Sequence, residues 1–149
     1  MQTIIRTNSD SQDFRNLIQK LDELLQVVDG EEHSFFAQYN NVENIKNVVV
    51  CYQDDQPIGC GAFKKIDSQT AEIKRMFVEP TFRQKGIASK ILQELEIWAK
   101  EEDFSIAILE TGRKLESAIA LYKKSGYVIT ENYGQYIGVE SSVCFSKNI

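Results

Sequence analysis

The chain has 149 residues and a net charge of −5, with 42% hydrophobic and 26% charged residues. This length and composition predict one globular domain over residues 1–149 and exclude a disordered chain. The acidic balance is atypical of a nucleic-acid binder, the single histidine and three cysteines argue against a metal site, and no run reaches the ~18 apolar residues of a membrane span.

The first half of the chain predicts a short strand, two helices and a hairpin. Residues 3–6 form a short β-like start, and apolar residues at spacings of three and four predict a helix over residues 11–28, capped by Asp10 or Ser11. Residues 34–39 predict a second, short helix. Strands over 47–53 and 58–64 flank a turn sequence, and a turn at Asp55 and Gln56 would place Cys51 opposite Cys60.

The second half alternates strands with helices. Apolar runs predict strands over residues 71–78, 105–109, 127–130 and 143–146, and one-sided apolar faces predict helices over 86–102 and 115–124. Hairpin strands pair antiparallel and strands joined through a helix cross over, so the order predicts an α/β (α+β) fold with a mixed sheet. We expect its three cysteines to be reduced thiols of a cytoplasmic protein.

Basic side chains gather in residues 71–90, which carry five basic and two acidic groups in an otherwise acidic chain. Within this segment a strand leads into a helix through a loop with the small residues Gly86 and Ala88. Free backbone N–H groups at a helix start bind phosphate where side chains leave room, and Arg83 and Lys85 add positive charge. The loop therefore has the outline of a pyrophosphate site.

Two other phosphate-binding patterns, GxxxxGK[ST] and GxGxxG, are absent from the sequence. The alternative interpretation is an ordinary strand–loop–helix turn that ends on a capping glycine.

Residues 83–88, Arg-Gln-Lys-Gly-Ile-Ala, match the R/Q-x-x-G-x-G/A signature of the GNAT acyltransferases. Residues 71–80 resemble the family's fourth strand, which runs into that loop. Residues 118–127 resemble its A-x-x-L-Y-x-x-x-G-F/Y block. The two blocks stand in the family's order, and the resemblance extends over about residues 47–147. It implies a mixed sheet of six to seven strands flanked by about four helices, and acetyl transfer from acetyl-CoA to an amine without a metal.

The resemblance also assigns the residues that bind CoA. The strand before the loop offers its backbone to the pantetheine arm, and the loop and helix start hold the pyrophosphate. Many members carry an asparagine before the last helix, and here Thr111 or Ser117 would take its contact. The cofactor-binding residues expected are Met76, Phe77, Val78, Arg83, Gln84, Lys85, Gly86, Ile87, Ala88, Ser89 and Thr111.

Amine acetylation needs a base for the ammonium proton and an acid for the departing thiolate. The resemblance places Glu72 as the leading base, with Glu110 as the alternative, acting directly or through water. Tyr122 matches the tyrosine that protonates the CoA sulfur in many members. The other interpretations are a surface glutamate paired with Lys74 or Lys64, and a tyrosine of the core.

The acceptor pocket is expected near residues 132–138, where Tyr133 and Tyr136 line it or cover the sheet, with residues 33–36 as the other wall. The preferred acceptor is a small-molecule primary amine. The alternatives are a protein lysine or N-terminus, or a non-catalytic acyl-CoA sensor. The family resemblance also suggests a homodimer.

Overall fold

The computed structural model describes residues 1–32 and 44–149. Its centre is a seven-stranded sheet in the order β1-β2-β3-β4-β5-β7-β6. Only β4 and β5 pair in parallel; every other pair of neighbours is antiparallel. The predicted mixed α/β sheet is thereby confirmed. The strands are β1 (Gln2–Thr7), β2 (Asn47–Gln53), β3 (Gln56–Lys65), β4 (Thr70–Val78), β5 (Ile106–Gly112), β6 (Val128–Thr130) and β7 (Ser142–Asn148).

Three α-helices lie in the described part of the chain: α1 (Gln12–Asp29), α3 (Ile87–Glu101) and α4 (Glu116–Lys124). The Ser11 hydroxyl caps α1 by accepting a hydrogen bond from the Phe14 N–H at 3.2 Å. The helix expected over residues 34–39 lies outside the described residues. None of the helices described is long and apolar enough to cross a membrane.

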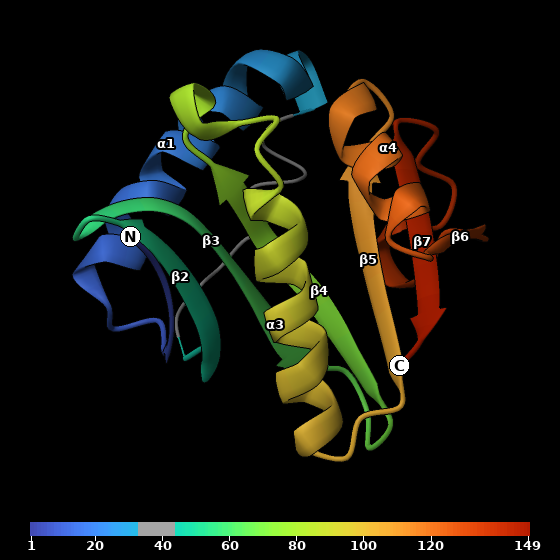
Figure 1. Ribbon diagram of the computed structural model, residues 1–149. Helices are drawn as coiled ribbons and strands as arrows, with labels where there is room; N and C mark the ends of the chain where they lie inside the picture. Colours follow the sequence, from blue (N-terminus) through green and yellow to red (C-terminus); the bar gives the residue numbers. More distant parts are fainter. Residues whose placement is uncertain (33–43) are drawn as a thin grey trace.

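Each face of the sheet has its own hydrophobic core. Side chains alternate between faces along a strand, so Val48 and Val50 of β2 pack with α1, whereas Val49 and Cys51 belong to the core under α3 and α4. Figure 1 shows α1 behind the sheet, and α3 and α4 in front of it. The α1 side chains buried there are Phe14, Leu17, Ile18 and Leu21.

The β2–β3 hairpin turns one residue earlier than the sequence suggests. Gln53 pairs with Gln56, so the two turn residues are Asp54 and Asp55, both with positive φ (48° and 70°). This geometry matches the right-handed twist of the strands, and aspartate tolerates it. The expected pairing of Cys51 with Cys60 is wrong: the earlier turn, together with a register shift between Cys51 and Tyr52, pairs Cys51 with Gly59. Both thiols are free and buried on opposite faces.

Strand β4 carries a bulge in its middle. Lys74 pairs with Ala62 and Phe77 with Cys60, so Arg75 and Met76 together stand opposite Gly61. Arg75 has a φ of 59°, the left-handed backbone that one type of bulge uses. A Cβ on Gly61 would lie 2.6 Å from the Met76 sulfur and 2.9 Å from a methyl group of Leu95, so a larger residue there would force these side chains to move. The bulge therefore interrupts the regular alternation of β4 side chains between the two faces of the sheet.

Strands β4 and β5 part soon after they meet. Their parallel pairing joins only Thr70–Glu72 to Ile106–Ile108, whereas β5 pairs with β7 along its whole length. Figure 1 shows the two strands diverging from the lower end of the sheet, with α3 over one and α4 over the other. From Ile73 to Val78 the edge of β4 that faces β5 is therefore outside the ladder.

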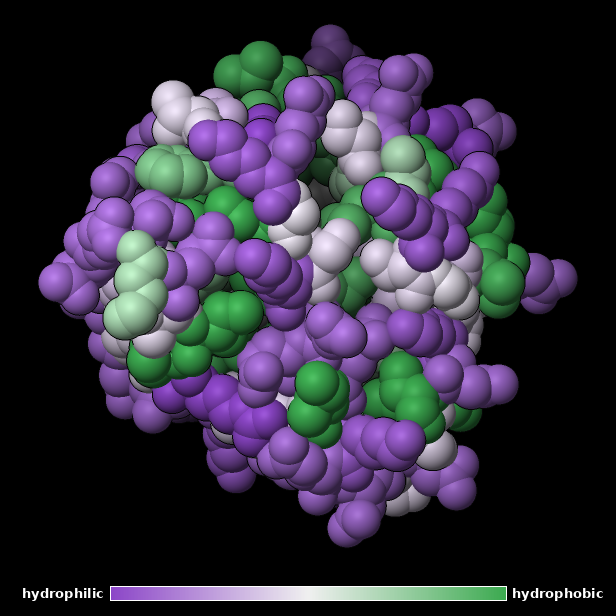
Figure 2. Space-filling view, in the orientation of Figure 1, coloured by the Kyte–Doolittle hydropathy of each residue, from purple (hydrophilic) through white to green (hydrophobic). Residues whose placement is uncertain are grey.

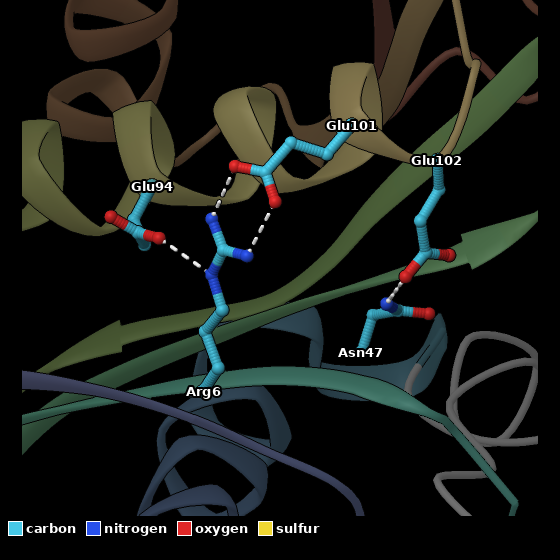
Figure 3. A network of polar contacts seen from close by, with 5 residues as sticks. All are labelled: Arg6, Asn47, Glu94, Glu101 and Glu102. Carbon is cyan, nitrogen blue, oxygen red and sulfur yellow. Dashed lines mark hydrogen bonds and ion pairs between the residues drawn. The ribbon is translucent and has the colours of Figure 1, made fainter.

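A polar network fastens the first two strands to α3 (Figure 3). Arg6 of β1 donates to Glu94 at 2.7 Å and to Glu101 at 2.8 and 3.0 Å, and Asn47 of β2 donates to Glu102 at 2.9 Å. Such a bidentate guanidinium–carboxylate pair has a defined geometry. The network helps to fix the angle of α3 against the sheet.

Candidate active site

The start of α3 leaves its backbone donors available. Gly86 is the N-cap, with a φ of 77°, and no side chain caps the helix. A Cβ added at Gly86 would meet no atom within 4 Å, so the space beside the loop is open. Gln84 also has a positive φ, of 62°. This loop therefore presents uncapped N–H groups at the positive end of a 15-residue helix, an arrangement suited to phosphate.

The basic side chains of the loop lie against the protein. The Arg83 Nε donates to the Val78 carbonyl at 2.8 Å, and its guanidinium lies 5.7 Å from the centre of the Phe77 ring. The Lys85 ammonium lies 5.5 Å from the Phe82 ring. Arg83 thus ties the loop to the end of β4.

The other residues expected to bind CoA differ in the exposure of their side chains. Phe77, Val78 and Ile87 are buried, so they can offer only their main chain to a ligand; Met76 and Ala88 are half-buried and Ser89 is exposed.

A cavity of about 140 Å³ lies where β4 and β5 diverge. It brings together residues of β4, β5, α1, α4 and the loop before β7. The space-filling view (Figure 2) shows a hollow in the upper part of the molecule, where hydrophobic and neutral side chains lie among hydrophilic ones. The lining residues are Leu21, Leu25, Asp29, Glu72, Ile73, Lys74, Arg75, Met76, Glu110, Thr111, Gly112, Leu115, Ala118, Tyr122 and Tyr136. The cavity thus contains the predicted Glu72, Glu110, Thr111, Tyr122 and Tyr136.

Glu72 is a buried, fully engaged carboxylate. It is 3% exposed, and its Oε2 accepts a 2.6 Å hydrogen bond from the Tyr133 hydroxyl. Its Oε1 lies 3.9 Å from the Lys74 ammonium and 4.0 Å from that of Lys64. Burial lowers the pKa of Lys74, and the nearby Glu72 opposes that shift. The alternative interpretation of Glu72 is a surface glutamate paired with Lys74 or Lys64. Both lysines do lie near Glu72, but the carboxylate lies in the cavity and not on the surface.

Glu110 is the less engaged of the two carboxylates. Its Oε2 accepts a 2.7 Å hydrogen bond from the Ser142 hydroxyl on β7. Burial raises the pKa of Glu110 from 4.5 to about 7, although the Ser142 hydrogen bond and the Lys74 charge work against the shift. A carboxylate with a pKa near neutrality exchanges protons readily at physiological pH, as a general base requires.

Tyr122 reaches the cavity from α4. It is 6% exposed and packs edge-on against Tyr127, with ring centres 5.9 Å apart. Burial, and then the charge of Glu110, raise the pKa of the Tyr122 phenol. The side chain therefore keeps its proton at physiological pH and can serve as a donor.

The loop before β7 closes the far side of the cavity. Tyr136 is 4% exposed and Tyr133 packs edge-on against it at 5.7 Å. The Asn132 amide donates to the carbonyls of Tyr136, Val139 and Ser142 at 3.0, 2.9 and 3.2 Å, which holds the loop in place. Only Tyr136 lines the cavity itself; Tyr133 acts on it through Glu72.

Sequence reasoning missed Lys74 and Arg75 as lining residues. The signal was two consecutive charged residues inside a strand whose neighbours are apolar. Both are buried, at 8% and 7% exposure. The expected residues 33–36 of the opposite wall lie outside the described part of the chain. Within that part, no group of three or more histidine, cysteine, aspartate or glutamate side chains could hold a metal ion.

Residues 12–127 match the family model described as Acetyltransferase (GNAT) family. The chain belongs to the GNAT acetyltransferase family. A GNAT relative, IAA acetyltransferase of Azospirillum brasilense, is 40% identical over 81 residues, which are 53% of this chain and 52% of that protein. The chain spans about half the length of this and another curated relative.

Solved GNAT structures show the same fold. An assigned acyl-CoA N-acyltransferase from Klebsiella pneumoniae is 26% identical, with a TM-score of 0.83 over 99% of this chain and 97% of that one. The PaiA N-acetyltransferase of Thermoplasma acidophilum, solved in complex with coenzyme A, is 18% identical, with a TM-score of 0.74 over 100% and 99% of the two chains. The divergence of β4 and β5 thus lies within a GNAT fold.

Proposed function

We propose that this protein transfers an acetyl group from acetyl-CoA to the primary amine of a small molecule by direct attack. The observation that carries the proposal is the cavity between the diverging β4 and β5, which Glu110, Glu72 and Tyr122 line together. The same fold in a relative solved with coenzyme A supports it.

The residues present fit coenzyme A. The open space at Gly86 and the uncapped N–H groups of α3 suit a pyrophosphate. The unpaired edge of β4 beyond Glu72 offers the backbone of Met76 and Val78 to an extended pantetheine arm. Bound there, acetyl-CoA supplies the activated acetyl thioester.

We assign the base to Glu110 and the acid to Tyr122. Glu110 first takes one proton from the ammonium, which leaves a neutral amine with the lone pair that attacks. As the N–C bond then forms and the C–S bond breaks, the Tyr122 hydroxyl gives its proton to the sulfur, and the second proton that leaves nitrogen restores the Tyr122 hydroxyl. Glu72 is the second carboxylate, which attracts and orients the ammonium. Glu72 already accepts a hydrogen bond from Tyr133 and lies 3.9 Å from the Lys74 ammonium, whereas Glu110 has a serine partner and a pKa raised to about 7.

The size of the cavity favours a small acceptor. Its volume of about 140 Å³ is well below the ~300–1,000 Å³ of pockets for drug-sized ligands. A larger hollow of about 650 Å³ lies between the loops at Arg113–Lys114 and Gly138–Ser141, and the carboxylates and Tyr122 do not line it. A small amine fits the first cavity better than a peptide segment does.

The test is release of CoA thiol from acetyl-CoA, measured with a panel of small amines, lysine peptides and free peptide N-termini. We expect turnover with small amines and its loss in Glu110→Gln. Glu96→Gln is the matched control and should retain activity, because Glu96 of α3 pairs with Tyr127 and Lys147 and does not line the cavity. Turnover only with peptides would favour a protein acetyltransferase. Tight CoA binding without release for any amine would favour a sensor.

A further inference from the structure

Arg75 is a buried cation, and most N–H donors of its guanidinium have no acceptor in the described part of the chain. It stands in the β4 bulge, and its side chain is 3% exposed. One nitrogen, Nη2, lies 2.9 Å from the Asp22 carboxylate of α1. In the described part of the chain, Nε and Nη1 are buried without any hydrogen-bond partner. Three of the five N–H bonds of the guanidinium, one on Nε and two on Nη1, therefore have no acceptor.

This arrangement is unusual for a guanidinium. Buried polar groups are nearly always paired, and an arginine remains charged at every physiological pH. The side chain of the partner, Asp22, is 51% exposed, so the ion pair lies at the edge of the protein. It leaves the inner nitrogens of the guanidinium without an acceptor among the described residues. A buried donor set without an acceptor points to an acceptor that arrives with a ligand.

The position of Arg75 in the cavity indicates which charges this ligand carries. Arg75 and Lys74 line the same cavity as Asp29, Glu72 and Glu110. The two cations come from β4, and the carboxylate assigned as base comes from β5, across the divergence of the strands. The cavity thus offers both signs of charge. A ligand that carries only positive charge would face both cations, and one that carries only negative charge would face the three acids.

We propose that Arg75 binds the carboxylate of the acceptor, so that the substrate class is an amino acid or another small amine that carries a carboxylate. This inference rests on the proposed acetyl transfer at the same cavity. A carboxylate oxygen accepts from the free N–H groups of Arg75, with Lys74 as the second cation nearby. The ammonium end of the same molecule then lies toward Glu72 and Glu110, where it loses its proton.

The experiment compares acceptors that differ only in the carboxylate. Wild-type protein and Arg75→Gln are assayed with glycine and β-alanine, and with glycinamide and β-alaninamide, in which a neutral amide replaces the charge. Lys64→Gln is the matched control: it removes one cation from the same face, 4.0 Å from Glu72, but Lys64 does not line the cavity. Thermal unfolding of each variant shows whether it is folded.

We expect kcat/KM to favour at least one carboxylate over its amide by about 30-fold or more in the wild type, as in Lys64→Gln. In Arg75→Gln the preference should shrink to a few-fold. Arg75→Lys keeps the charge without the planar donors, so an intermediate preference is expected, and this variant serves if the glutamine change unfolds the protein. Equal rates with acids and amides in the wild type would overturn the inference while leaving amine acetylation intact.

If no amine is acetylated, the proposed function fails, and carboxylate binding is measured directly. Calorimetric titration of β-alanine into wild-type protein with CoA present should then give binding that Arg75→Gln abolishes. Absent or unchanged binding would overturn the assignment of Arg75.

Discussion

The phenol of Tyr133 donates a 2.6 Å hydrogen bond to the carboxylate of Glu72, 61 residues earlier in the chain. It joins the loop before β7 to the first part of β4, beside the cavity that Glu72 lines. Burial, followed by the charge of Glu72, raises the pKa of Tyr133, so the phenol remains the donor. The contact fixes one carboxylate of the site through a residue that does not itself line the cavity.

Tyr133→Phe should therefore lower both stability and activity. A hydrogen bond to a charged group contributes about 1.5–3 kcal/mol, so we expect a loss of that order in the free energy of unfolding, measured with urea. The orientation of Glu72 is lost with it, so kcat/KM should also fall. Tyr127→Phe is the control, because Tyr127 donates a 2.8 Å hydrogen bond to Glu96 away from the cavity. A fall in kcat/KM as large in the control as in Tyr133→Phe would contradict the positioning role.

Glu110 should leave a signature in stability against pH. Burial raises its pKa from 4.5 to about 7, so between these values the folded chain holds a proton that the unfolded chain has lost. The free energy of unfolding then falls as pH rises through this window, by up to roughly 3 kcal/mol from this group. Relative to the wild type, Glu110→Gln should gain that amount between pH 4 and pH 8. A difference that stays flat with pH would show that Glu110 ionises normally.

The same group should govern the rate. A base must be deprotonated to act, so log kcat/KM with a small amine should rise with pH, with one inflection near pH 7, and level off above it. In Glu110→Gln the inflection should disappear and the rate fall by about 10²- to 10⁴-fold. Retention of the inflection in this variant, with its loss in Glu72→Gln, would move the base to Glu72.

Local patterns predicted much of this fold. Apolar spacing located all four ends of α1 and α3 to within one residue, because burial on one face imposes a helical period. The β2 strand was predicted with its observed bounds, Asn47–Gln53. Long-range pairing was not predictable in the same way: nothing local specifies that β7 pairs between β5 and β6.

The motifs predicted which residues belong to the site, but not where each basic side chain lies. The sequence grouped the basic residues of 71–90 into one anion site, but the structure separates them. Arg75 faces the cavity beside α1, Arg83 folds back onto β4, and Lys90 donates to Gln2 of β1 at 2.9 Å. The bulge at Arg75 contributes to this separation within β4, because one extra residue changes which face each following side chain of the strand takes.

Tyr122→Phe should slow the chemical step without weakening CoA binding. Phenylalanine preserves the ring packing against Tyr127 and Phe145, so stability should change little. The proton for the sulfur is lost, and we expect kcat to fall by about 10²- to 10⁴-fold. Calorimetric titration with CoA provides the control, and its Kd should match the wild type. Full kcat in this variant would remove Tyr122 from the acid role.

Gly86→Ala should have two separate effects, one from the backbone conformation on stability and one from the added methyl group on cofactor binding. A Cβ there would meet no neighbour, but the φ of 77° is unfavourable for alanine, so we expect a loss of about 1–2 kcal/mol in the free energy of unfolding. The methyl group also enters the open side of the loop and opposes the close approach of a pyrophosphate, so the KM for acetyl-CoA should rise.

Gly138→Ala is the matched control for that change. Gly138 has a φ of 80° and similarly open surroundings, but it lies in the loop before β7, away from α3. Its backbone penalty should be similar, and its KM for acetyl-CoA should stay at the wild-type value. A higher KM in both variants would attribute the effect to a loosened fold, whereas a rise confined to Gly86→Ala assigns the open space at the start of α3 to the cofactor.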